Sequence, residues 1–433
     1  MEHQHLDAAD LEHLLATDRT AKQNAQLFHL LAVCPRCREA GGWLLELHQA
    51  NALPQVFGLI DATLARSRAE APRLLEELLA LEAEERLTRL HADGRFTSLG
   101  LCELIVSKSR ETAPEQPADA VHLADLAVQV ADRISDSDLF EESWVYQLRS
   151  LAWAALGNAL RVQGDLLGAE RSFDMADSWW KAGCRGNEDA LGYEPILLAL
   201  KAPLRTAQRR FPEAIKLFDE AVELFLHGEH PDPHLAGRSL VAKAGALIEM
   251  GDTRAAIQAL KKANGLIDPN REPRLLLCLR HNLVDCLSKA DRHQEAAALL
   301  PDLKALAATH GREQDRRRLD WVEGRIATGL GDHDRACRLL TQVRQTFVDQ
   351  GNAFDAALAA LDLSISHLQE GKTAEVRELA DEMVTVFSAL EVAREPMAAL
   401  LLFQEAAHRE TATAELARKV AATLTRASGP DPA

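Results

Sequence analysis

A short apolar pattern recurs along most of this chain at a nearly constant interval. In its clearest copy, Ala169, Phe173 and Ala176 fall at helical spacing and form one apolar stripe. The copies begin 38 to 45 residues apart, at Ala124, Ala169, Ala214, Ala256, Ala296, Ala336, Val376 and, in a weaker copy that pairs with Ala421, at Ala414. A helical hairpin cannot bury such a stripe alone, so the pattern predicts seven or eight stacked hairpins with a continuous core.

A turn precedes six copies of the stripe, from Ala169 to Val376. Three of these turns are Gly-Asp pairs, at Gly164-Asp165, Gly251-Asp252 and Gly331-Asp332. Glycine readily adopts the left-handed conformation that ends a helix, and an aspartate side chain can cap the helix that follows. We therefore expect each first helix to end, and each second helix to begin, at these pairs.

The segment before the clearest stripe completes one hairpin. Trp153, Leu156, Gly157 and Leu160 share one helical stripe, and the small residues Gly157 and Ala169 would let the two helices approach closely. This spacing resembles the tetratricopeptide (TPR) repeat. The resemblance implies an all-α, right-handed solenoid that binds a protein or peptide along a concave groove lined by its first helices. The period exceeds the family's usual length of about 34 residues, and a generic α-solenoid of hairpins is the alternative.

Composition agrees with a helical, globular chain. Of the 433 residues 47% are hydrophobic and 5% aromatic, and the formal net charge is −17. The abundant Ala and Leu favour helix, and an acidic surface repels phosphate backbones, so we expect no nucleic-acid partner. Neither a signal peptide nor the roughly 20-residue apolar run needed to cross a bilayer is visible. The sequence therefore predicts a cytoplasmic protein without membrane contact.

Residues 1–50 do not follow the repeat and contain a Cys-x-x-Cys pair. Cys34 and Cys37 have the spacing of two zinc ligands, and Pro35 favours a turn between them. An imidazole near the end of the preceding helix, such as that of His29, can supply a third ligand.

This head resembles the small zinc-binding fold of bacterial anti-sigma factors. In that family a histidine precedes the Cys-x-x-Cys pair and an upstream residue completes the site. The resemblance implies His5, His29, Cys34 and Cys37 as ligands of one structural zinc, with His3 and His13 as alternatives to His5. The gap between His29 and Cys34 is one residue longer than usual in the family. The alternative is a metal-free three-helix cap with reduced thiols.

Motifs for chemistry are absent: there is no phosphate loop, nucleophile elbow or His-Glu-x-x-His zinc motif. We therefore expect no enzymatic activity and look to the predicted groove instead. The repeat register places six polar or aromatic candidates there: Asn158, Arg161, His281, Asp285, Trp321 and Arg325. Asn158 and Arg161 are similar to the carboxylate clamp of some TPR proteins, but Val241, Gly245, Leu361 and Ile365 occupy the clamp positions of later repeats. Ordinary exposed side chains are the alternative for each candidate.

These observations predict a helical head at residues 1–50, a helical connecting region at 51–115, a TPR-like solenoid at 116–426 and a flexible tail at 427–433. The expected function is a non-enzymatic scaffold or adaptor that binds another protein or a peptide in the groove. The alternatives are an anti-sigma-like or signalling regulator, in which the head and repeats control a partner protein, and, less favoured, an enzyme.

Overall fold

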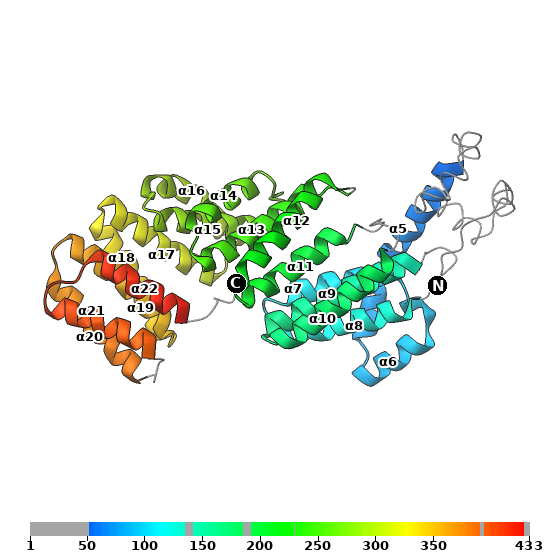
Figure 1. The fold of residues 1–433 in the computed structure, drawn as a ribbon, viewed down its shortest axis with the longest axis horizontal. Helices are drawn as coiled ribbons and strands as arrows, with labels where there is room; N and C mark the ends of the chain where they lie inside the picture. Colours follow the sequence, from blue (N-terminus) through cyan, green and yellow to red (C-terminus); the bar gives the residue numbers. More distant parts are fainter. Residues whose placement is uncertain (1–51, 135–141, 185–191, 229, 390–393, 428–433) are drawn as a thin grey trace. The chain divides into compact units, whose positions relative to one another are not determined.

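The computed structural model describes residues 52–134, 142–184, 192–228, 230–389 and 394–427 (Figure 1). All regular elements in these ranges are helices. The chain divides into two compact units, Met1–Pro231 and Asp232–Ala433. The predicted domain boundaries at residues 50, 115 and 426 stay predictions.

The described part of the first unit consists of helices that pack in consecutive pairs. The pairs α7/α8, α9/α10 and α11/α12 are antiparallel hairpins, and α5 packs against α7. The elements are α5 (Ala52–Leu79), α6 (Ala83–Ala92), the 3₁₀ turn η2 (Gly94–Phe96), α7 (Leu99–Thr112), α8 (Pro117–Arg133), α9 (Glu142–Gln163), α10 (Leu166–Gly183), α11 (Glu194–Ala207) and α12 (Phe211–His227).

The second unit continues the same arrangement with five more pairs, from α13/α14 to α21/α22. Its helices are α13 (Pro233–Met250), α14 (Thr253–Asn264), α15 (Pro273–Lys289), α16 (His293–His310), α17 (Glu313–Leu330), α18 (His333–Asp349), α19 (Ala353–Gln369), α20 (Thr373–Ala389), α21 (Arg394–His408) and α22 (Ala414–Ala427). None of the described helices is both long enough and apolar enough to span a membrane.

The apolar stripes that recur in the sequence are the cores of these hairpins. Seven of them lie on the second helices α8, α10, α12, α14, α16, α18 and α20, and every stripe residue is buried. In the clearest copy, Ala169, Phe173 and Ala176 are all at most 3% exposed. The predicted hairpin array is therefore confirmed.

The Gly-Asp turns also form as predicted. Gly164, Gly251 and Gly331 have φ values of 99°, 92° and 81°, which lie in the left-handed region. The aspartate after each glycine accepts a hydrogen bond from the backbone N–H three residues later, at N–O distances of 2.8 to 3.2 Å. Each pair ends one helix and caps the next.

Two glycines of α13 and its turn allow a matched stability test. Gly245 lies inside the helix and Gly251 ends it with a left-handed φ, and an added Cβ would meet no atom within 4 Å at either position. We expect Gly251→Ala to lower the free energy of unfolding by about 1 kcal/mol through backbone strain. Gly245→Ala should raise it by about 0.5–1 kcal/mol, because alanine favours helix. Urea unfolding measures both, and changes of equal sign would contradict the assigned conformations.

Close approach within the first clear hairpin depends on Gly157. A Cβ atom at this position would lie 2.9 Å from the Phe173 ring and 3.2 Å from the Ala169 carbonyl oxygen. The equivalent Gly324 of α17 would meet Leu340 of α18 at 2.8 Å. Small residues therefore let these helices pack at short range, as the sequence pattern predicts.

The last hairpin departs from the expected register. The weak stripe at Ala414 and Ala421 is only half-buried, whereas Ala417, Val420 and Leu424 of α22 are buried. The reason is that α22 packs against α19 as well as against its own partner α21. The stripe predicted for this copy was therefore wrong, although α21 and α22 do pack as a final hairpin.

Candidate functional site

The first helices of the second unit form a continuous layer. The pairs α13 and α15, α15 and α17, and α17 and α19 each approach one another, and no pair of described second helices in this unit makes a comparable contact. Helices that pack closer together lie on the inner side of a curved array. We call the exposed side of α13, α15, α17 and α19 the first-helix face.

Four of the six candidate residues lie on this face in equivalent positions. His281 and Trp321 each stand ten residues before the left-handed residue of their turn, and Asp285 and Arg325 stand six residues before it. They therefore occupy corresponding places on the neighbouring helices α15 and α17.

Arg325 lies at the centre of a charged network on the first-helix face. Its guanidinium forms an ion pair with Asp285 of α15, and its Nε lies 3.9 Å from an oxygen of Asp362 on α19. Trp321 donates a hydrogen bond of 2.7 Å from its indole nitrogen to Asp362, and its ring centroid lies 5.9 Å from the Arg325 guanidinium carbon. The side chains of Arg325, Asp285 and Asp362 are 20%, 16% and 18% exposed. The network thus links three first helices.

Burial and neighbouring positive charges shift the pKa values of the two aspartates in opposite directions. Burial alone would raise the pKa of Asp285, but the charges of Lys289 and Arg325 outweigh it and hold this pKa well below its usual range. For Asp362 burial is the larger effect, and its pKa is raised even though Arg325 lies nearby. Burial lowers the pKa of His281, which keeps this imidazole neutral near pH 7. Arg325 is therefore the cation that faces both carboxylates, and Lys289 is a second cation paired with Asp285.

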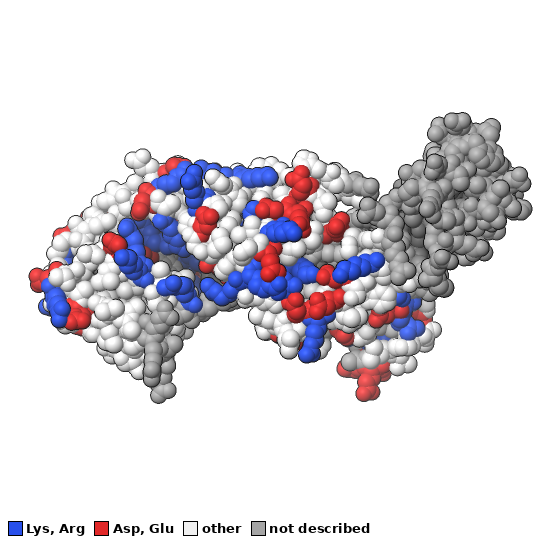
Figure 2. Space-filling model, in the orientation of Figure 1, with Lys and Arg blue, Asp and Glu red and all other residues white. Residues whose placement is uncertain are grey.

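Several buried nitrogen atoms around the network have no hydrogen-bond partner among the described residues. They are Nε2 of His281 and both Nε and Nη1 of Arg317. Arg317 stands one helical turn before Trp321. Figure 2 shows basic side chains gathered where Figure 1 places α17. Because an unpaired buried donor costs free energy, these atoms mark where a ligand with acceptor groups would be stabilised.

The other two candidates, Asn158 and Arg161, belong to α9 in the first unit. Two guanidinium nitrogens of Arg161 donate hydrogen bonds to Oδ1 of Asn158, at 3.0 and 3.3 Å. Asn158 is buried, and burial lowers the pKa of Arg161. Asn158 and Arg161 therefore contact each other in the first unit, whereas the network of Arg325 belongs to the second unit.

Asp362 is the member of the network that sequence reasoning missed. The repeat register directs attention to Leu361 and Ile365, which are buried core residues of α19. Asp362 stands one residue after the first of these positions and points to Trp321 and Arg325. The one sign of Asp362 in the sequence was that an acidic residue directly follows the register position of Leu361.

The proposed zinc ligands His5, His29, Cys34 and Cys37 lie outside the described residues, and their structural zinc stays a prediction. Two cysteines within the described ranges, Cys102 and Cys286, are fully buried. Burial raises the pKa of both thiols, that of Cys286 to about 12. These thiols are protonated at neutral pH and serve as small core residues.

No family model and no curated protein matches the sequence. Among solved structures, the fold is similar to the crystal structure of a Rap protein complexed with competence and sporulation factor. The TM-score is 0.50 at 14% sequence identity, and the match covers 76% of this chain and 87% of the Rap chain. The chain folds as an all-α solenoid of TPR-like hairpins. At this identity the likeness establishes the fold alone.

Proposed function

We propose that this chain is a non-enzymatic scaffold that binds a peptide, or an extended segment of a partner protein, along its first-helix face. The observation that carries the proposal is the unsatisfied polar surface beside Trp321. Buried nitrogens of His281 and Arg317 lack partners next to a tryptophan and an arginine, the residue types most enriched in binding hot spots. The backbone carbonyls and carboxylates of a peptide are suitable acceptors for these donors.

Gly245, on the neighbouring helix α13, is a second observation in favour of binding at the first-helix face. It occupies the position on α13 that Asp285 and Arg325 occupy on α15 and α17, and apart from its chain neighbours and the adjoining helix backbone no atom lies within 4 Å of where its Cβ would be. A glycine inside a helix costs stability, and the described contacts of Gly245 do not require one. Open space at this position would let a ligand backbone approach the helix closely.

The comparison is in keeping with this proposal. The Rap protein of similar fold was crystallised in complex with competence and sporulation factor. That protein therefore binds a factor, and we propose a comparable binding role for the first-helix face here.

Filling the space at Gly245 tests the proposal without disturbing the charged network. Peptides are selected from a displayed random library on the immobilised full-length chain, and their affinities are then measured by fluorescence anisotropy. We expect Gly245→Leu to weaken binding at least about tenfold, equivalent to about 1.4 kcal/mol, because the new side chain occupies the open space. Thermal unfolding of this variant should match or exceed that of the wild type.

Ala298→Leu is the matched control, because Ala298 is exposed within the second helix α16. This variant should bind the selected peptides as tightly as the wild type. If the selected peptides bound the Gly245→Leu variant as tightly as the wild type, the binding site would not lie on this face. A library that yields no peptide would contradict peptide binding altogether.

A further inference from the structure

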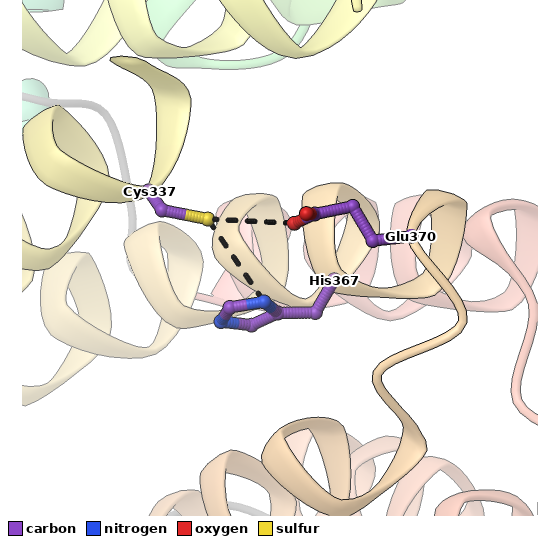
Figure 3. Close-up of side chains that lie close together, drawn as sticks. All are labelled: Cys337, His367 and Glu370. Atoms are coloured by element: carbon purple, nitrogen blue, oxygen red, sulfur yellow. Dashed lines mark hydrogen bonds between the residues drawn. The ribbon is translucent and has the colours of Figure 1, made fainter. Parts of the chain in front are cut away.

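A second group of functional side chains lies where α18 begins and α19 ends. Cys337 stands one turn into α18, His367 lies in the last turn of α19, and Glu370 follows that helix directly. The left-handed Gly371 then turns the chain into α20. Figure 3 shows the three side chains converging from the two helices.

The donor atoms of these side chains are close to the spacing of a metal site. The Sγ of Cys337 lies 3.9 Å from Nδ1 of His367 and 4.0 Å from Oε2 of Glu370. All three donor atoms lie within 4.8 Å of one another. In a tetrahedral zinc site the ligand bond lengths place such atoms about 3.5 Å apart. Shifts of a few tenths of an ångström at Cys337 would therefore suffice for its two contacts.

Neighbouring residues orient two of the groups. Lys372 Nζ lies 2.9 Å from Oε1 of Glu370, so the other carboxylate oxygen, Oε2, is left facing the thiol. Ser366 Oγ lies 3.9 Å from Cys337 Sγ and 3.2 Å from Nδ1 of His333. Partners of this kind fix ligand geometry in known metal sites.

We propose that Cys337, His367 and Glu370 form a zinc-binding site that joins α18 to the end of α19. A thiolate, an imidazole and a carboxylate together favour Zn²⁺ over Mg²⁺ or Ca²⁺, which prefer oxygen ligands alone. Binding forms a zinc–sulfur bond and releases the thiol proton to solvent. His333 is held by Ser366, so water completes the fourth position of the tetrahedron.

The same three residues also have an explanation without metal. Cys337 is half-buried, and burial raises the pKa of its thiol. A protonated thiol could simply fill the space between His367 and Glu370. The two explanations differ in whether the thiol binds a metal ion when one is supplied.

Cobalt titration of the full-length chain distinguishes the two. The chain carries Cys34→Ser and Cys37→Ser, so that the head contributes no thiolate ligand, and it is stripped with a chelator. We expect one equivalent of Co²⁺ to bind with a thiolate-to-cobalt absorption band, and Zn²⁺ to displace it. Adding Cys337→Ser or His367→Ala should remove the band and weaken Zn²⁺ binding at least about 100-fold, more than the loss of an outer partner costs.

Cys278→Ser is the control, since Cys278 is an exposed cysteine on α15. It should leave the band and the stoichiometry unchanged. The proposal is overturned if the Cys34→Ser, Cys37→Ser chain binds no Co²⁺ through a thiolate. It is also overturned if the band persists after Cys337→Ser, with circular dichroism confirming that each variant is folded.

Discussion

Replacing Arg325 by methionine is expected to lower the free energy of unfolding of the second unit by about 3 kcal/mol. The variant keeps the aliphatic volume but removes the cation between the carboxylates of Asp285 and Asp362, so that Asp285 keeps its pair with Lys289 alone. Breaking a buried ion pair from one side typically costs about 3–5 kcal/mol. Because 16–20% of these side-chain surfaces remains exposed, we expect the lower end of that range.

The pH dependence of this loss has a defined sign. In the wild type Arg325 and Lys289 hold the pKa of Asp285 below its usual range. The ion pair therefore contributes stability above the unfolded pKa of about 3.9 and loses it as the pH falls. In the variant both carboxylates can protonate at low pH, which relieves the negative charge that Arg325 no longer balances. The difference in free energy of unfolding between variant and wild type should be largest near pH 7 and should shrink below about pH 4.

Urea unfolding at several pH values measures this difference, with hydrogen exchange of α15 and α17 as the local probe. Arg292→Met is the control, because Arg292 pairs with Glu295 at 41% and 51% exposure. An exposed pair of this kind contributes little to stability, because water screens its charges. A loss at Arg325 no larger than that at Arg292, or one independent of pH, would show that the network does not stabilise the unit.

Phe173→Ala in α10 is expected to have an effect of similar size in the first unit. Phe173 is 1% exposed and fills the space beside Gly157 of α9. Truncation of a buried phenylalanine costs about 3–5 kcal/mol, because transfer free energy is lost and a cavity remains. Urea unfolding followed by circular dichroism measures the change.

The close approach of the two helices predicts that this change is coupled to one at Gly157. Gly157→Val alone should cost about 1–3 kcal/mol, because its side chain overlaps the Phe173 ring. In the double variant valine occupies part of the cavity left by phenylalanine. We expect the combined loss to fall short of the sum by about 1–3 kcal/mol. Additive losses would contradict the packing of Phe173 against Gly157.

Local patterns in the amino-acid sequence predict much of the fold. The stripe Ala169, Phe173 and Ala176 identifies a buried helix face, and Gly164-Asp165 identifies the turn that precedes it. Both signals are short-range, because helical periodicity and the left-handed conformation of glycine depend on neighbouring residues. The same reasoning failed at Ala414 and Ala421, since α22 also packs on α19 and thereby buries another side of the helix.

Only part of the candidate site could be predicted from the repeat register. Register alone selected His281, Asp285, Trp321 and Arg325, because equivalent positions of neighbouring first helices share a face. It could not select Asp362, whose role depends on how α19 is rotated against α17. It also gave no indication that His367 and Glu370 lie beside Cys337, since these residues are about 30 positions apart and meet only when α18 packs on α19.

The sequence by itself determined that this chain is an array of helical hairpins, where its turns lie and which stripes, except the last, are buried. These properties follow from spacing within one or two helices. Only the tertiary structure decided which charges meet, because an ion pair such as Arg325 with Asp285 joins separate hairpins. The net charge of −17 likewise did not indicate the unpartnered arginine nitrogens beside Trp321. Total charge is a sum over the whole chain, whereas a binding face depends on the few side chains that packing brings together.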